Sequence, residues 1–148
     1  KRVHLVGHSA GSFVAYGLCE SLKNTNPDVF VHTSYLSPLA VYSGFQWRFG
    51  TNNFGSCADI SNAYIDKHDT VPGSSVPLKN AHTFEVSALR LADSSYQGSP
   101  HFWPIAFYRQ QVLGKNAPFW DENKDINMRY ATQSKTVLRP GKIEHKIQ

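Results

Sequence analysis

The sequence predicts an α/β fold with a mostly parallel sheet and flanking helices. Short apolar runs at residues 2–7 and 29–36 are typical of buried parallel strands. Between them, residues 9–23 carry apolar side chains at helical spacing. A strand, a helix and a second strand in this order form the unit from which parallel sheets are built.

The first elements end at residues that interrupt regular structure. Gly7 ends the first strand, Pro27 breaks the helix, and Pro38 stops the second strand. The helix stripe expected to face the sheet consists of Val14, Leu18 and Leu22. Gly17 lies beside that stripe, and we expect it to let the helix pack closely on the sheet.

Two further strands and one helix are predicted in the rest of the chain. An aromatic and glycine-rich loop comes first and contains Phe45, Trp47, Phe49 and Phe54. Residues 59–65 form the third predicted strand and residues 82–89 the fourth, with the turn-rich segment 67–80 between them. A final helix is predicted over residues 104–113, because it begins at a proline and is followed by a glycine.

The chain divides into two regions of different character. Residues 1–115 hold the predicted strands and helices, whereas residues 116–148 are polar, irregular and basic, as in a tail or linker. Of the net charge of +4, most lies from Lys135 onward, where there are four cations and one anion. The remainder shows no basic stripe with interleaved aromatics, so we expect no nucleic-acid partner.

The start of the chain and its cysteines bear on where the protein works. The chain enters a core strand directly after Lys1, so we interpret it as the later part of a domain, with the upstream half as its partner. A targeting segment would lie upstream, which leaves the compartment open, secretion included. Cys19 and Cys57 permit one disulfide, but a buried free thiol is the commoner role for Cys19 in an apolar helix.

The motif Gly7-His8-Ser9-Ala10-Gly11 joins the first strand to the helix. A serine at such a turn takes a strained backbone, and Gly7 and Gly11 avoid collisions around it. The turn exposes the Ser9 hydroxyl and directs the Ala10 N–H toward an oxygen that becomes negative during acyl transfer. We predict Ser9 as a nucleophile and Ala10 as an oxyanion donor, and we expect His8 to serve packing. The alternative for Ser9 is an ordinary helix N-cap.

Seven histidines compete to accept the proton of Ser9. Five of them are argued against by their position: His4, His8 and His32 by their order in the chain or their placement in strands, His68 by its place beside the acid loop, and His145 by its place in the tail. His82 begins a strand, where a structural role is the more common one. His101 follows Gly98-Ser99-Pro100 in a loop before an aromatic helix. We therefore predict His101 as the base and keep His82 as the alternative.

A carboxylate is needed to hold and orient this histidine. Asp69 stands a few residues beyond the third predicted strand and precedes His101 by 32 residues, which leaves room for one strand and two loops. Asp66 is nearer the end of that strand, and Asp59 stands at its start. We predict Asp69 as the acid and keep Asp66 as the alternative. Either aspartate could instead cap this turn-rich loop.

From Arg2 to about Leu113 the chain resembles the C-terminal half of α/β-hydrolase lipases. Residues 2–11 are similar to the central strand and nucleophile elbow of that superfamily, whose lipases often place a histidine before the serine. Pro100-His101-Phe102-Trp103 resembles the histidine loop of neutral lipases, and Asp69-Thr70-Val71-Pro72 resembles an acid turn seen in many members. The resemblance implies a partial α/β-hydrolase fold that lacks the N-terminal strands.

The chain departs from the family pattern at two places. Lipases of the pancreatic type have an Asp-Pro pair where this chain reads Leu36-Ser37-Pro38, so the acid would have moved one strand later. The loop that carries the second oxyanion donor in this superfamily would lie before Lys1. We therefore expect this segment alone to have little activity compared with a longer chain.

The resemblance implies a lipase- or esterase-like serine hydrolase that cleaves carboxylic esters and needs no metal or organic cofactor. Its substrate would be a small ester or a lipid. The aromatic residues 45–54 suit an acyl pocket or contact with a lipid surface, and equally an ordinary core. Hydrolysis of amides or thioesters, and a non-catalytic binding module with the same fold, are the alternatives.

Overall fold

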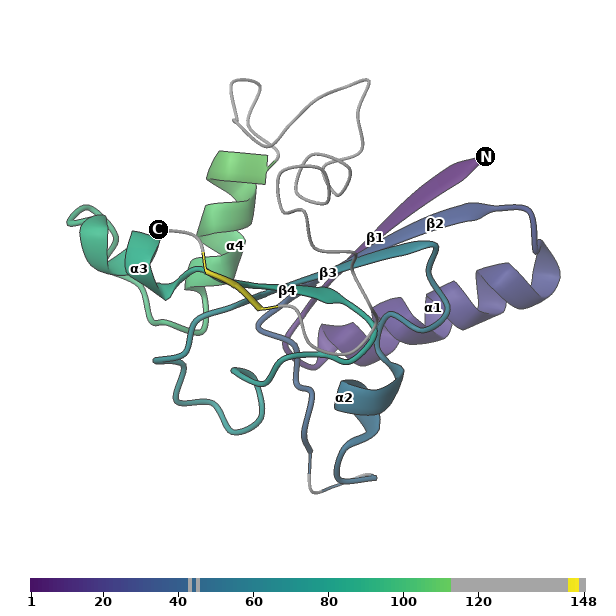
Figure 1. Ribbon diagram of the computed structural model, residues 1–148, viewed down its shortest axis with the longest axis horizontal. Coiled ribbons are helices and arrows are strands. Elements are labelled where there is room, and N and C mark those ends of the chain that lie inside the picture. Colours follow the sequence, from purple (N-terminus) through teal and green to yellow (C-terminus); the bar gives the residue numbers. More distant parts are fainter. Residues whose placement is uncertain (43, 45, 113–143, 147–148) are drawn as a thin grey trace.

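The computed structural model describes residues 1–42, 44, 46–112 and 144–146. In this part of the chain, parallel strands form one sheet in the order β1-β2-β3-β4-β5, with helices packed against it (Figure 1). The strands are β1 (Arg2–His8), β2 (Phe30–Leu36), β3 (Ile60–Ile65), β4 (His82–Glu85) and β5 (Glu144–Lys146). The helices are α1 (Gly11–Thr25), α2 (Phe49–Asn53), α3 (Ser87–Ala92), α4 (Trp103–Phe107) and the π-helical turn η1 (Tyr108–Val112). The α/β class predicted from the sequence is confirmed.

Strands that follow one another in the chain also lie next to one another in the sheet. The register of β1 on β2 runs from Arg2 opposite Phe30 to His8 opposite Leu36. All neighbouring strands pair in the same direction, so the loops that leave their carboxyl ends emerge at one edge of the sheet. Ser9 follows β1 at this edge, and Asp69 follows β3.

Side chains from the two faces of the sheet make two separate cores, because successive residues of a strand point to opposite sides. Under α1, the first core contains Ala15, Tyr35, Ala40, Phe54, Ala63 and Leu78. Under α4, the second contains Leu36, Tyr64, Phe84, Val86, Trp103, Phe107 and Tyr108. In Figure 1, α1 and α4 accordingly lie on opposite sides of the strands.

Helix α1 presents a different face to the sheet from the one expected. Val14 is 65% exposed and Leu18 is 50% exposed, whereas the buried residues of α1 are Ser12, Ala15 and Cys19. The reason lies at Gly7, where an added Cβ would meet the Ser12 Cα at 2.9 Å and the Ala15 Cβ at 3.0 Å. Small residues on both elements allow the backbones to approach closely, and this contact sets the rotation of the helix.

The expectations for Gly17 and Cys19, both in α1, are wrong. An added Cβ at Gly17 would meet nothing within 4 Å, so Gly17 makes no close contact with the sheet. Cys19 is not a free thiol, since it forms a disulfide with Cys57 across a Cα–Cα distance of 6.0 Å. The disulfide joins α1 to the segment before β3, and Cys19 is fully buried beside Val29 and Val31.

Several element boundaries also differ from the expectation. The fourth strand ends at Glu85, because its carboxylate accepts the backbone N–H of Ser87 at 2.9 Å and α3 begins there. The aromatic loop contains the short helix α2. Strand β5 lies within the region predicted as a tail and pairs in parallel with β4. The predicted domain boundary near residue 115 and most of that tail lie outside the described residues.

None of the helices in the described part of the chain is long and apolar enough to span a membrane.

Candidate active site

Ser9 occupies a sharp turn between β1 and α1. Its φ of 53° lies in the left-handed region, which side chains other than glycine rarely adopt. The turn is fixed by backbone hydrogen bonds on both sides, from the Ser9 N–H to the Leu36 carbonyl at 3.1 Å and from the Leu39 N–H to the Ser9 carbonyl at 3.2 Å. A strained serine held by its surroundings is the feature that the motif predicted.

The two glycines of the motif have different roles. Gly7 is required, because a side chain there would collide with the start of α1, at the Gly11 carbonyl and the Ser12 Cα. The expectation that Gly11 also avoids a collision is wrong, because an added Cβ there would meet nothing within 4 Å. Ala10 is the N-cap residue of α1, so its N–H belongs to the helix end whose donors have no partner inside the helix.

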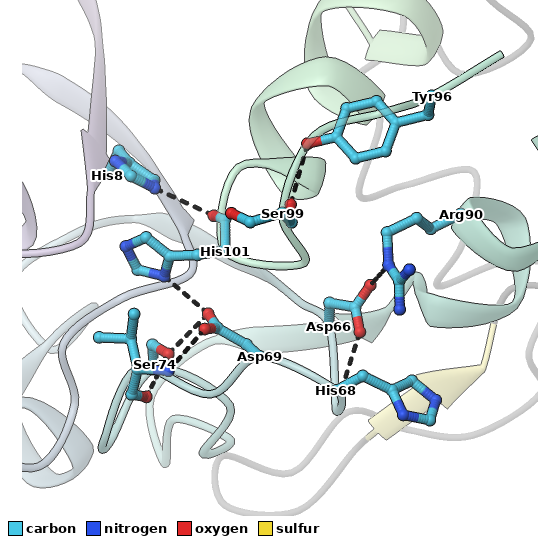
Figure 2. A network of polar contacts seen from close by, with 10 residues as sticks. His8, Asp66, His68, Asp69, Ser74, Arg90, Tyr96, Ser99 and His101 are labelled. Carbon is cyan, nitrogen blue, oxygen red and sulfur yellow. Dashed lines mark hydrogen bonds and ion pairs between the residues drawn. The ribbon is translucent and has the colours of Figure 1, made fainter.

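Asp69 follows β3 and is held as a carboxylate. Its Oδ1 accepts the Val71 N–H at 2.9 Å, and its Oδ2 accepts the Ser74 hydroxyl at 2.6 Å and the His101 Nδ1–H at 2.7 Å (Figure 2). Burial opposes ionisation of this carboxyl, but the hydrogen bonds from Ser74, His101 and Val71 outweigh it and lower the pKa of Asp69. The group is therefore ionised at neutral pH.

His101 lies on a tight turn that precedes α4. The Phe102 N–H donates to the Ser99 carbonyl at 3.1 Å, the Tyr96 hydroxyl donates to that same carbonyl at 2.9 Å, and the Trp103 indole N–H donates to the Val86 carbonyl at 2.8 Å. The His101 side chain is 12% exposed.

The contact with Asp69 fixes the tautomer of His101. An ionised carboxylate can only accept hydrogen bonds, so the proton shared with Asp69 belongs to Nδ1. In the neutral ring, Nε2 then carries a lone pair and is able to accept a proton. This is the arrangement that a general base next to a serine requires.

The end of β1 brings Ser9 beside the loop of His101. His8, the residue before Ser9, donates from Nε2 to the His101 carbonyl at 3.1 Å, and the two imidazole centroids lie 4.7 Å apart. In the described part of the chain, the Ser9 hydroxyl makes no hydrogen bond to His101. Contacts of this kind are often long without a substrate and shorten in the reactive complex.

The alternative acid and base are placed elsewhere. Asp66 is fully buried and pairs with Arg90 at 2.5 Å, and it also accepts the His68 N–H at 2.8 Å (Figure 2). His82 pairs with Asn62 at the first position of β4, at the amino end of the strand. Ser9 and Asp69 follow the carboxyl ends of strands, whereas His82 is at the amino end of β4. His82 therefore lies at the opposite edge of the sheet.

The remaining candidates from the sequence have structural surroundings. Asp59 pairs with Lys23 at 2.6 Å. The rings of His4 and His32 stack at 4.1 Å on neighbouring strands, and His4 also contacts Tyr108 at 3.1 Å. His68 is exposed. The backbone of His145 belongs to β5, and its side chain lies outside the described set.

Ser37 follows β2 at the place where the resembled lipases carry their acid. It has a φ of 42°, and its buried hydroxyl has no hydrogen-bond partner among the described residues. The Ser37 N–H donates to the Tyr64 carbonyl at 2.9 Å. No described acid occupies this position, and the carboxylate beside His101 comes from the next strand.

Two side chains that hold this pair, Ser74 and His8, were not predicted from the sequence to do so. Ser74 donates to the same Asp69 oxygen that contacts His101. The bond from the Val71 N–H closes a turn on the side chain two residues earlier, which aspartate commonly forms, so this one had a local signal. The contact of His8 with His101 spans 93 residues and had no signal in the sequence.

Among the described residues, no group of three or more histidine, cysteine, aspartate or glutamate side chains is arranged to hold a metal ion. Comparisons of this chain with protein-family models, with curated proteins and with solved structures found no match.

Proposed function

We propose that this chain carries the triad of a serine hydrolase that cleaves carboxylic esters, on a partial α/β-hydrolase fold. The observation that supports the proposal best is the hydrogen bond of 2.7 Å between His101 Nδ1 and Asp69 Oδ2, beside the turn that holds Ser9. The left-handed backbone of Ser9 and its position before a helix N-terminus support the same assignment.

In this mechanism His101 accepts the Ser9 proton at Nε2 while Oγ attacks the ester carbonyl. The ionised Asp69 stabilises the imidazolium that forms. The Ala10 N–H donates to the oxygen that becomes negative, and the start of α1 adds favourable potential. His101 then gives its proton to the leaving alcohol, and a water molecule repeats the sequence to release the acid and restore Ser9.

The disulfide adds a proposal about compartment. A disulfide that joins two elements of a core persists in oxidising environments, such as the outside of the cell or the secretory pathway. We therefore propose that the protein works in such an environment. Its substrates would be the esters and lipids found there.

Labelling with a fluorophosphonate probe tests the nucleophile, because the probe forms a covalent bond only with an activated serine. We expect the wild-type chain to be labelled, more slowly than a longer chain that supplies the second oxyanion donor, and Ser9→Ala to be silent, with Ser37→Ala labelled like the wild type as a matched control. Labelling of Ser9→Ala at the wild-type rate would overturn the assignment of Ser9.

A panel of p-nitrophenyl esters of increasing acyl length separates an esterase from a non-catalytic binding module. We expect turnover that depends on acyl length and disappears in Ser9→Ala. No turnover of any ester, together with no labelling, would favour a binding module with the same fold. Amide and thioester substrates run in parallel would identify the other alternative chemistry.

A further inference from the structure

His8 is the last residue of β1 and directly precedes Ser9. Figure 2 shows its side chain pointing toward the loop that holds His101. Its Nε2 contacts the His101 carbonyl at 3.1 Å. A carbonyl oxygen can only accept, so His8 donates through an Nε2–H. Within the part of the chain that the structure describes, no other hydrogen bond joins residues 7–11 to residues 99–103. His8 therefore forms the polar link between the predicted nucleophile and the predicted base.

The ring of His8 also packs against the residues of that loop. Its centroid lies 4.7 Å from that of His101 and 5.3 Å from that of Phe102, while His101 and Phe102 are 5.5 Å apart. The three rings thus contact one another pairwise. Because His8 is the last residue of β1, this packing ties the loop to a strand whose position the sheet fixes.

The charge state of His8 suits a neighbour of a general base. Burial lowers the pKa of His8, which outweighs the opposing effect of the hydrogen bond to the His101 carbonyl. The titratable groups that act on His8 electrostatically are His101 and Asp69. A neutral His8 adds no positive charge beside the imidazolium that His101 becomes during the reaction.

We propose that His8 is a positioning residue, which holds the His101 loop at the distance from Ser9 that proton transfer requires. The inference rests on the proposed function, because it concerns the same site. The hydrogen bond of His8 goes to the backbone carbonyl of His101 and not to the ring nitrogens of that residue. It acts through the backbone of His101, so its loss alters the placement of the base and leaves the chemical groups in place.

Two substitutions separate the hydrogen bond from the ring. His8→Phe keeps an aromatic ring and removes the donor, whereas His8→Gln keeps an N–H at a similar reach and removes the ring. We expect His8→Phe to lower kcat about tenfold, the effect of one lost hydrogen bond, with KM little changed. His8→Gln is expected to retain most of kcat. His68→Phe is the matched control, because His68 is exposed and turned away from His101 (Figure 2).

A measurement on the ring of His101 tests the positioning role of His8 independently of turnover. The exchange rate of the His101 Nδ1 proton, followed by NMR on the full chain, reports how well the contact with Asp69 is held. We expect faster exchange in His8→Phe, and a rate near that of the wild type in His8→Gln and His68→Phe.

The outcomes of these experiments are distinct. Wild-type kcat and proton exchange in His8→Phe would overturn the positioning role, and so would equal losses in His8→Phe and His8→Gln. If the wild-type chain is neither labelled by fluorophosphonate nor active on esters, the proposed function fails. The proton exchange of His101 would still show whether His8 holds the base.

Discussion

Replacement of Asp69 by asparagine tests the candidate site at the group with the most defined surroundings. Asp69 Oδ1 faces the Val71 N–H, which can only donate, and Oδ2 faces His101 Nδ1. An asparagine that keeps its carbonyl toward Val71 turns its amino group toward His101. That amino group donates, so His101 must place its lone pair on Nδ1 and its proton on Nε2. The ring can then no longer accept the proton of Ser9.

The opposite orientation of the amide sets two donors against each other at Val71. A buried donor without an acceptor costs about 1–3 kcal/mol, so the orientation with the wrong histidine tautomer is favoured. We expect Asp69→Asn to lower kcat about 10³- to 10⁴-fold on p-nitrophenyl esters, the effect of a wrong tautomer in a serine triad. The rate of fluorophosphonate labelling should fall in parallel, while the folded fraction in circular dichroism stays near that of the wild type.

Asp66→Asn is the comparison that makes this prediction selective. Asp66 contacts Arg90 and the His68 N–H and has no contact with His101. We expect Asp66→Asn to unfold at a lower urea concentration but to keep its turnover while it is folded. Activity of Asp69→Asn within about tenfold of the wild type would refute the reasoning. A folded Asp66→Asn protein that loses as much activity would refute it as well.

Three further predictions concern stability. Replacing both Cys19 and Cys57 by serine should lower the free energy of unfolding by about 4 kcal/mol, as expected for a disulfide that closes a loop of 38 residues. Urea unfolding with and without reductant measures this loss. Arg90→Met should cost about 3 kcal/mol in urea unfolding, because it leaves the fully buried Asp66 carboxylate without its cation. For Glu85, burial opposes ionisation, but hydrogen bonds from the start of α3 and a lysine outweigh it and lower its pKa below 4.5. Its ionised form therefore stabilises the fold at pH values above 4.5 and loses this contribution as the pH falls through the lowered pKa of the folded state. The difference in free energy of unfolding between wild type and Glu85→Gln, measured by urea unfolding, should therefore narrow as the pH is lowered from neutral into the range below 4.5.

The succession of elements along the chain and the class of the fold could be predicted, because both depend on local patterns. The apolar runs of β1, β2 and β3 read directly as strands, and each boundary falls within a residue or two of the expected one. The fourth strand was predicted too long, since the alternation of Phe84, Val86 and Ala88 continues into α3. What ends the strand is a contact of the Glu85 side chain with the backbone, which residue pattern alone does not encode.

The rotation of α1 could not be predicted from its apolar residues. Hydrophobic spacing favoured Val14, Leu18 and Leu22 as the buried face. Of these, Leu22 packs against the core and is partly buried, whereas Val14 and Leu18 are exposed and the buried residues of the helix are smaller. The tight approach of Gly7 to Ala15 and the disulfide of Cys19 decide the rotation. The first joins the helix to the strand before it, and the second joins residues 38 positions apart in the sequence. A pattern within one helix cannot report such contacts.

The candidate site was predictable to a different degree for each residue. Ser9 is marked by a local motif, in which the close approach of α1 demands a glycine at position 7. Asp69 and His101 were chosen by their order and by the loops they occupy, and the structure brings these two together. The rejection of Asp66 as a partner of His101 rests on Arg90, which lies 24 residues away and became visible only in the fold.

The same packing contact shapes both the fold and the site. Gly7 lets α1 approach β1, and this approach sets where the helix begins relative to the end of the strand. Ser9 lies between these two points, so its left-handed backbone is a consequence of how closely the helix packs. On the other side, His8 extends from the end of β1 to the His101 loop. The placement of Ser9 relative to the His101 loop therefore depends on the position of β1 in the sheet.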